Sequence, residues 1–465
     1  MSASRADWGV MLRDWLIPDT HPPLYQTLLK LWIGFTGSGE MATRSLSLLM
    51  AGTGLVATAL FASGRGPGRR LVSVAFLGTS PAFLFYAQES RSYATSLALS
   101  AVMLGSALEL RQRRLGGSSN SLLVGWSERA LRRLFSLACL LLSLSHYFSL
   151  LFVLVVLAVV CAEGLVWRRR QQVLPLLLGV LAWPMAHLLS SSLSNKLERL
   201  DWIQVTPISG TFSEFLGGTL PLLVPGRAGP EGLLIALGVS MALMVALTAA
   251  RRHPESAAAA PSGLAVGEAR FLLLAIGGFV ALMLPIDLVK PLSQARYYIV
   301  VLPALAYLCG DGWELGQRFS HGRRLALTAL LVVWLLLQWQ MGQRELDEKR
   351  APLQNVKLMG RFVERSGVCD RGCWSNGWLL EALSPLYFQP GQLQPFPGDS
   401  LAPDQPLQQP FLGFHGASKD RPALRAANPS MTCWEAPGAW PSTPFILLPG
   451  TSAVQPAQHG LRPCS

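Results

Sequence analysis

Charged residues are scarce in this chain, and their scarcity excludes an ordinary soluble domain. Only 14% of the 465 residues are charged, whereas soluble domains carry about 25%. Hydrophobic residues make up 51% of the chain and occur in long runs rather than in the alternation typical of half-buried strands. This pattern indicates a polytopic membrane protein.

Three other absences narrow the class further. No basic stripe is interleaved with aromatic residues, so the net charge of +12 does not indicate nucleic-acid binding. No repeat of about 20 to 50 residues marks a solenoid. No strong cluster of metal ligands stands out in the sequence. The basic residues instead gather between alternate hydrophobic runs, as the positive-inside rule predicts for cytoplasmic turns.

The basic turns orient about ten membrane spans within residues 1–340. Segment 22–36 is shorter than the roughly 20 residues that a span needs, so we expect an interfacial helix, a re-entrant helix, or a span with a weak hydropathy signal. Run 134–167 has basic residues at both ends and is therefore expected to be a hairpin, with His146 and Tyr147 at its outer tip. The runs are 41–63, 71–88, 91–110, 134–167, 173–193, 231–249, 271–289, 298–316 and 325–340.

Residues 341–465 differ from the rest because they are rich in Pro, Gly and Gln and contain no run long enough to span a membrane. We expect a small α/β domain outside the cytoplasm, with a helix near 353–364 and a strand at 445–448. It holds four of the seven cysteines, Cys369, Cys373, Cys433 and Cys464. An even number of cysteines in an oxidising compartment predicts disulfides, and the three pairings remain open.

Two polar stretches stand at the ends of apolar helices. The first reads Asp-Thr-His-Pro-Pro-Leu-Tyr at 19–25, and the second reads Gln-Glu-Ser-Arg-Ser-Tyr at 88–93. Two prolines in series remove two backbone donors and hold the first stretch extended. Because ionisable groups beside a bilayer are costly, they indicate function. We interpret the two stretches as halves of one site at a membrane surface.

These stretches, with Ser-His-Tyr-Phe at 145–148 and Ala-Arg-Tyr at 295–297, resemble landmarks of the GT-C superfamily of membrane glycosyltransferases. The most similar group is family 39, the bacterial branch related to the protein O-mannosyltransferases and the lipid A aminoarabinose transferase. The resemblance covers roughly the first three quarters of the chain. It implies an all-α polytopic domain that moves a sugar from a polyprenyl-phosphate donor to a lipid, glycan or protein acceptor outside the cytoplasm.

The resemblance also implies roles for particular side chains. Asp19 and Glu89 would be the catalytic acids, and His21, Arg91, His146, Arg296 and Tyr297 would bind the donor phosphate. A divalent metal ion is left open, because some relatives use one and others do not. The protein would be a multi-pass protein of the plasma (inner) membrane, in contact with membrane lipid, with its site facing the periplasm or the exterior.

Plainer roles compete with each assignment. Asp19 would serve equally well as a helix cap, and Glu89 as an ion-pair partner of Arg91. Arg296 and Tyr297 are also common anchors at a membrane interface, and His146 would pack at the hairpin tip. At the level of the whole protein, a lipid-linked glycan transporter and a non-catalytic membrane relative are the alternatives.

The start of the sequence bears on the last alternative. In relatives, a first membrane span precedes the His-Pro-Pro element, and an acidic pair that supplies the base follows that span. This sequence begins after the position of the acidic pair. We expect that the start codon is assigned too far downstream and that the true protein has one more span; a shortened, inactive relative is the alternative.

Overall fold

In the computed structural model, the chain forms two compact units, Met1–Gln343 and Arg344–Ser465. The structure describes residues 4, 6–17, 21–62, 66–115, 122–123, 125–163, 170–190, 206, 208–224, 234, 238, 262–317, 319–375, 388–389, 391–395, 407–413, 417–437, 444–450 and 454–464.

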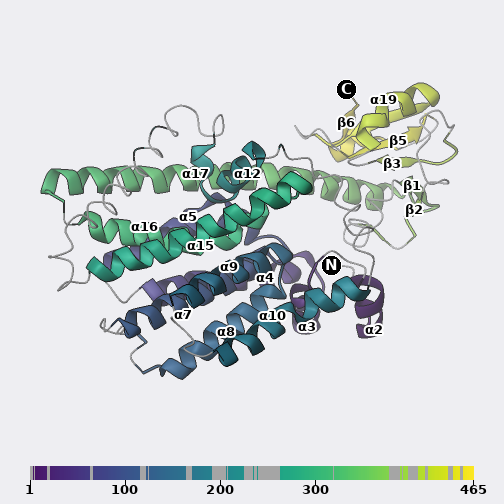
Figure 1. The fold of residues 1–465 in the computed structure, drawn as a ribbon. Helices are drawn as coiled ribbons and strands as arrows, with labels where there is room; N and C mark the ends of the chain where they lie inside the picture. Colours follow the sequence, from purple (N-terminus) through teal and green to yellow (C-terminus); the bar gives the residue numbers. More distant parts are fainter. Residues whose placement is uncertain are drawn as a thin grey trace. The chain divides into compact units, whose positions relative to one another are not determined.

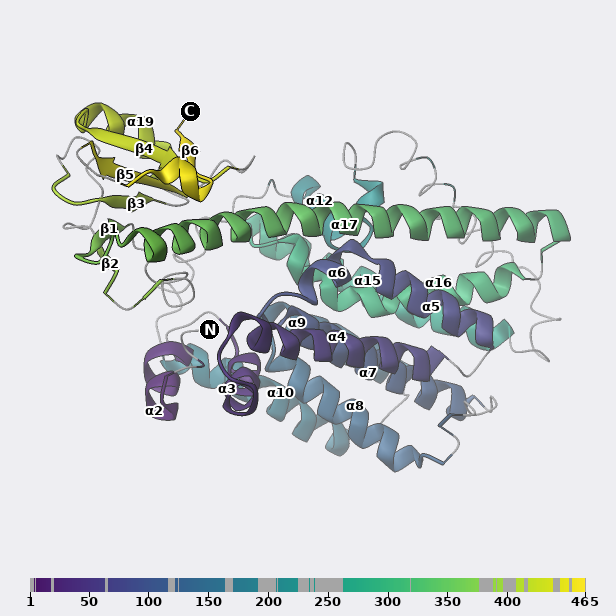
Figure 2. The ribbon, with the colours of Figure 1, turned by 180° about the vertical axis from the view of Figure 1, so that it is seen from behind.

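The first unit is built from helices, which Figures 1 and 2 show from opposite sides. In the described part, α4 packs along α7, α7 along α8, α5 along α16, and α9 along α15. The helices are α2 (Trp8–Val10), the π-helix η1 (Met11–Leu16), α3 (Leu24–Thr36), α4 (Glu40–Ala62), α5 (Pro67–Thr79), α6 (Pro81–Tyr86), α7 (Tyr93–Arg114), α8 (Glu128–Ser143), α9 (Tyr147–Ala162), α10 (Arg170–Ser190), α12 (Ser209–Thr219), η2 (Pro221–Leu223), α15 (Ser262–Val289), η3 (Ala295–Val301), α16 (Leu302–Gly316) and α17 (His321–Ser366), whose residues up to Gln343 belong to this unit.

Within the described residues, five helices are long and apolar enough to cross a membrane: Glu40–Ala62, Tyr93–Arg114, Gly267–Val289, Ala295–Gly316 and α17. The apolar helix α9 and the Leu176–His187 part of α10 are shorter. The predicted class, a polytopic α-helical membrane protein with a small C-terminal domain, is confirmed. The predicted run 231–249 lies outside the described residues, apart from isolated positions.

The hairpin predicted for run 134–167 is present as α8 and α9, and its corner at 144–146 contains His146. The His146 side chain caps α9, because its Nδ1 accepts a hydrogen bond from the backbone N–H of Phe148 at 3.3 Å. The corner that the charge pattern predicted is thus held by one of the predicted site residues.

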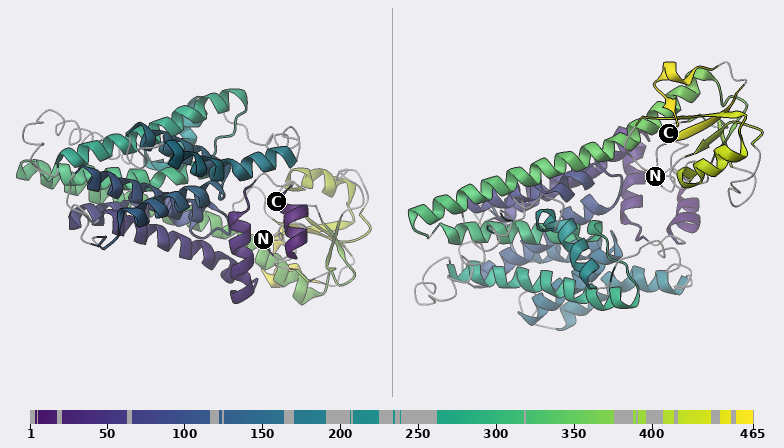
Figure 3. Two further views of the ribbon diagram at one scale, coloured as in Figure 1. Left: turned by 60° about the horizontal axis from the view of Figure 1, so that its bottom comes forward. Right: turned by 90° about the horizontal axis from the view of Figure 1, so that it is seen from above.

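Other segments differ from the prediction for identifiable reasons. Run 71–88 is two helices, α5 and α6, because Pro81 begins a new helix and disfavours a helical Ser80. Run 298–316 begins as the 3-10 helix η3. The last run and the separate helix expected near 353–364 are one helix, α17, which Figure 3 shows unbroken.

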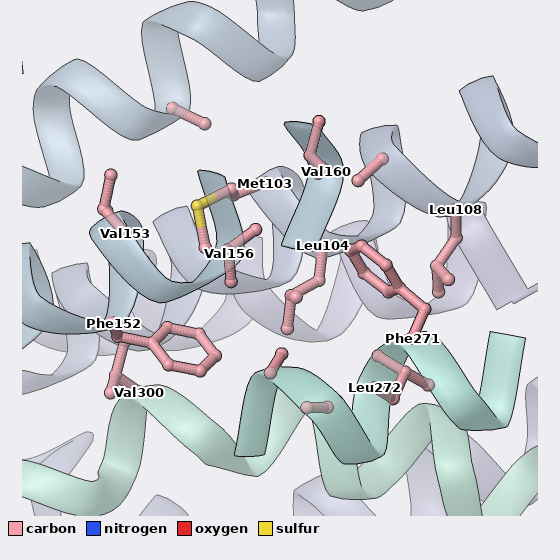
Figure 4. Packing of buried hydrophobic residues seen from close by; sticks show 14 of the residues in the cluster. Met103, Leu104, Leu108, Phe152, Val153, Val156, Val160, Phe271, Leu272 and Val300 are labelled. Carbon is pink, nitrogen blue, oxygen red and sulfur yellow. The ribbon is translucent and has the colours of Figure 1, made fainter. Parts of the chain in front are cut away.

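The core of the first unit lies where α7, α9, α15 and η3 meet. Figure 4 shows Met103 and Leu104 of α7 beside Phe152 and Val156 of α9, with Phe271 of α15 closing the cluster. All five side chains are completely buried. Because lipid tails are as apolar as these side chains, close packing and hydrogen bonds, rather than burial from water, hold such helices together.

Gly105 of α7 permits the close approach of α4. A Cβ atom at Gly105 would stand 2.3 Å from Cγ and Cδ2 of the Phe61 ring. We expect Gly105→Ala to destabilise the protein by about 1–3 kcal/mol, because the two helices would have to separate. Thermal unfolding in detergent measures this. Gly52→Ala in α4, where a Cβ meets open space, is the matched control; equal unfolding temperatures for the two variants would contradict the close approach.

An ionic cluster, which we call the Arg69 cluster, joins helices at one end of the first unit. Arg69 in the first turn of α5 is 2% exposed. Its Nε donates to Oδ1 of Asp311 (2.6 Å), its Nη2 to Oε2 of Glu268 (3.1 Å), and its Nη1 to the carbonyl of Ala62 (3.3 Å). The end of α4, the starts of α5 and α15, and the last two turns of α16 are thereby tied together.

The second unit is organised around a sheet with the strand order β2-β1-β3-β5-β4-β6 in the described residues. The β1–β2 and β1–β3 pairs are parallel and the remaining pairs antiparallel. The strands are β1 (Cys373–Ser375), β2 (Leu393–Pro395), β3 (Phe411–Gly413), β4 (Met431–Glu435), β5 (Phe445–Pro449) and β6 (Arg462–Pro463), and the strand expected at 445–448 is β5.

Alternation along β5 buries both faces of this sheet. Ile446 and Leu448 pack with Phe362 of α17, whereas Phe445 and Leu447 pack with Leu424 of α19 (Ala417–Ala427). Successive side chains of a strand point to opposite faces, so two helices can cover one strand from two sides. The open cysteine pairing is resolved as Cys369–Cys373 and Cys433–Cys464.

Candidate functional site

Three segments that are far apart in the sequence line one pocket in the first unit. The pocket has a volume of about 250 Å³. It draws on the His-Pro-Pro stretch before and at the start of α3, the turn between α6 and α7, and the corner between α8 and α9. Its lining is His21, Pro22, Tyr25, Gln26, Ser90, Arg91, Ser92, Tyr93 and Ser145. The two stretches interpreted as halves of one site therefore meet.

The His-Pro-Pro stretch is fixed on both sides. The backbone N–H of Leu24, the first donor after the two prolines, donates to the carbonyl of Leu144 at the α8–α9 corner (3.0 Å). In the first turn of α3, the Tyr25 hydroxyl is 3.1 Å from the Ser47 hydroxyl of α4. These bonds set the position of His21 beside the hairpin corner.

Serine hydroxyls join the second stretch to the same corner. Ser96 in the first turn of α7 lies 2.8 Å from the hydroxyl of Ser145 and accepts a hydrogen bond from Ser149 of α9 at 3.1 Å. All three side chains are buried. The start of α7, which follows the turn with Arg91 and presents Tyr93 to the pocket, is therefore attached to the α8–α9 corner by buried hydrogen bonds.

His146 lies at the centre of a cage of rings. Its ring centroid is 4.9 Å from that of Tyr297, 5.5 Å from that of His21 and 6.0 Å from that of Tyr93. Phe148 stacks on Tyr297 at 4.1 Å. Since Nδ1 of His146 accepts the Phe148 N–H, the neutral ring carries its hydrogen on Nε2, and this buried atom has no hydrogen-bond partner among the described residues. A buried donor without a partner is costly and suits a polar ligand.

Basic side chains surround this cage. Burial, together with the neighbouring charges of His21, Arg296 and Arg91, holds the pKa of the His146 imidazole well below its usual value. The Arg296 guanidinium lies over the Tyr297 ring, 5.4 Å from its centroid. Arg91, Arg296 and a donor on neutral His146 thus converge on the region next to the pocket, which makes it suited to a phosphate group.

The lowered pKa of His146 predicts a loss of stability in acid. The unfolded chain binds a proton at about pH 6.5 and the folded chain only at lower pH, so stability is fully present above about pH 6.5 and falls below it. We expect the unfolding temperature of the wild type to decrease more steeply between about pH 7.5 and about pH 5 than that of His146→Asn. Parallel curves for the two proteins would contradict a buried neutral imidazole.

The remaining predicted residues are placed less fully. Glu89 lies in the turn before α7 and acts electrostatically on the Tyr25 phenol, whose pKa is raised to about 12, chiefly by burial. Asp19 lies outside the described residues. In the part of the chain that the structure describes, no group of three or more His, Cys, Asp or Glu side chains is arranged to hold a metal ion.

Sequence reasoning missed several lining residues. Tyr25, Ser90 and Tyr93 lie inside the two quoted stretches, and Ser145 begins the Ser-His-Tyr-Phe motif, but none was assigned a role. The sequence feature that could have identified these four residues is their position inside those motifs. His187, in contrast, belongs to another network: its Nε2 is 2.9 Å from the carbonyl of Ile17, and its Nδ1 bonds the Tyr147 hydroxyl.

Comparison with solved structures decides the fold. The crystal structure of ArnT from Cupriavidus metallidurans in the apo state matches with a TM-score of 0.58 at 14% identity, over 96% of this chain and 92% of that one. The chain has an ArnT-like fold. ArnT from the same organism bound to undecaprenyl phosphate matches with a TM-score of 0.52 at 13% identity, over 92% of this chain and 87% of that one.

The ArnT-like fold is the architecture that the resemblance implied, a polytopic α-helical protein with a small C-terminal domain. No family model matches the sequence, and no curated protein matches it. The likeness to ArnT is therefore a likeness of fold that extends over 96% of this chain.

Proposed function

We propose that this protein is a membrane glycosyltransferase that moves a sugar from a polyprenyl-phosphate donor to an acceptor outside the cytoplasm. The observation that carries this proposal is the meeting of the His-Pro-Pro stretch, the Arg91 turn and the His146 corner around one pocket. The ArnT structure with bound undecaprenyl phosphate supports a polyprenyl phosphate as the lipid.

The chemistry requires a charged environment for the phosphate that leaves the sugar. Arg91 and Arg296 supply positive charge, and guanidinium groups bind phosphate through paired hydrogen bonds. The Nε2–H of neutral His146 supplies a further donor in a buried setting, where such a bond is strong. His21 and Tyr297 pack against this imidazole and hold its ring in place.

A carboxylate must also take the proton of the acceptor. Glu89, in the turn that also carries Arg91, is the first candidate for this role, and Asp19 is the second candidate from the motif. This proposal allows for a divalent metal ion but does not require one. The acceptor in this proposal is a lipid, glycan or protein.

We place the site on the periplasmic or exterior face of the plasma (inner) membrane. Helix α7 runs from the pocket at Tyr93 to Arg111, Arg113 and Arg114 in its last turn, which the charge rule assigns to the cytoplasm. Residues 1–340 would be the transferase domain and residues 341–465 an extracytoplasmic domain. The disulfides Cys369–Cys373 and Cys433–Cys464 favour an oxidising compartment for the latter.

The distribution of buried charge favours this proposal over a lipid-linked glycan transporter. Transporters bind their substrate near the middle of the membrane, on broken helices. The Arg69 cluster instead lies near helix ends, with Arg69 in the first turn of α5 and Glu268 beside the start of the apolar segment Gly267–Val289. Its charges are also paired with one another rather than turned toward a pocket.

The proposal is tested with membranes containing the full chain and undecaprenyl phosphates that carry radiolabelled hexoses or pentoses. We expect label to pass from the lipid donor to a membrane or protein acceptor, and Glu89→Gln to lower the rate by about 100-fold or more if Glu89 is the base. Movement of the intact lipid-linked sugar across proteoliposomes without transfer would instead support a transporter, and transfer by Glu89→Gln at the wild-type rate would remove Glu89 from the site.

A further inference from the structure

The turn that leads into Arg296 is held by two buried or half-buried carboxylates. Asp287, near the end of α15, is completely buried. Its Oδ1 accepts hydrogen bonds from the backbone N–H groups of Leu292 (2.8 Å) and Ser293 (2.9 Å). Oε2 of Glu214 accepts the backbone N–H of Ala295, the residue before Arg296, at 2.6 Å. Each of these three backbone donors is therefore bound to a carboxylate oxygen.

Helix α12 supplies one of these carboxylates and supports the other. Glu214 belongs to α12, and Thr211, three residues earlier, donates its hydroxyl to Oδ2 of Asp287 at 2.6 Å. On the same helix, Gly218 approaches the turn so closely that a Cβ would stand 2.0 Å from the carbonyl oxygen of Ala295. Helix α12 thus contacts the turn through Glu214 and Gly218 and supports Asp287 through Thr211.

The far side of the turn is fixed as well. The Ser293 hydroxyl lies 2.7 Å from the Tyr298 hydroxyl, and Phe215 of α12 packs edge-on against the Tyr298 ring at 5.4 Å. The backbone of Arg296 and Tyr297 lies between Ala295 and Tyr298, which these contacts hold in place. The Arg296 charge acts on His146 electrostatically. The direction of the Arg296 side chain therefore sets where its charge lies relative to the rings around His146.

We propose that Glu214 and Asp287 are positioning residues, which act through the turn 292–295 to hold the Arg296 guanidinium toward the donor phosphate. The inference rests on the proposed function. Both carboxylates accept hydrogen bonds from backbone groups of the turn, so they act on Arg296 indirectly, through the position of the backbone. Removing such support misplaces a charged contact, and misplacement by about 1 Å can cost about 100-fold in rate.

The test measures undecaprenyl phosphate binding and sugar-transfer kinetics of the full chain in detergent. We expect Glu214→Ala to weaken binding and raise KM by about 10-fold or more, and Glu214→Gln, which keeps an acceptor for the Ala295 N–H, to stay within about threefold of wild type. Ser213→Ala, an exposed neighbour on α12, is the matched control and should match wild type.

A double-mutant cycle separates positioning from a merely structural role. If Glu214 acts through Arg296, adding Glu214→Ala to Arg296→Ala should weaken binding no further. Full additivity of the two losses, or wild-type binding by Glu214→Ala, would overturn the positioning role and leave the proposed function intact. A wild type that neither binds undecaprenyl phosphate nor transfers sugar would overturn the proposed function, and this inference with it.

Discussion

Replacement of Arg296 with alanine is expected to lower kcat/KM for sugar transfer by about 100- to 1000-fold. The guanidinium is one of the positive charges that converge on the His146 cage, and removing one such group from a preorganised site typically has an effect of this size. Arg296→Lys keeps the charge but loses the paired donors, so it should recover only part of the activity. Initial rates with a labelled donor measure both variants.

The matched control for this result is Arg323→Ala, which removes an exposed arginine near the start of α17. It should leave the rate within about twofold of wild type, because exposed charges contribute little. Equal rates for Arg296→Ala and Arg323→Ala would show that Arg296 is an interfacial anchor rather than a phosphate ligand.

Replacement of Arg69 with methionine is expected to have the largest effect on stability, about 3–5 kcal/mol, because it leaves the buried carboxylates of Asp311 and Glu268 without their shared cation. Thermal unfolding in detergent measures this effect. Arg70→Ala removes the exposed neighbour in the same turn and should change the unfolding temperature little.

A combined variant tests the cause of that loss. Adding Asp311→Asn and Glu268→Gln to Arg69→Met removes the two negative charges that Arg69 balances and should recover part of the stability. A triple variant that unfolds at a lower temperature than Arg69→Met would indicate that shape and hydrogen bonding, rather than charge, dominate at the Arg69 cluster.

Much of the helical framework could be predicted because hydropathy and charge are local signals. The corner at His146 followed from basic residues at both ends of run 134–167, and the structure has a corner there. The continuation of α17 could not be found this way. The hydrophobic run ends near residue 340, but five of the six residues in the stretch 345–350, all except Asp347, are good helix formers, so the helix continues beyond that run.

Some parts of the candidate site could likewise be predicted from the sequence, and others could not. Its two main stretches could be predicted because ionisable residues between apolar runs are conspicuous. The support from α12 could not, because Glu214 and Ala295 are 81 residues apart and no periodic pattern links them. The Arg69–Asp311 pair spans 242 residues, and only the rarity of buried charge could have singled out either partner.

The most direct measurement compares the binding of undecaprenyl phosphate and of undecaprenol, its phosphate-free counterpart, to the full chain in detergent. If the Arg91, His146 and Arg296 groups form a phosphate site, wild type should bind the phosphorylated lipid at least about tenfold more tightly. The preference should vanish in Arg91→Ala/Arg296→Ala. Equal affinity of the wild type for the two lipids would contradict a phosphate site at this corner of the fold.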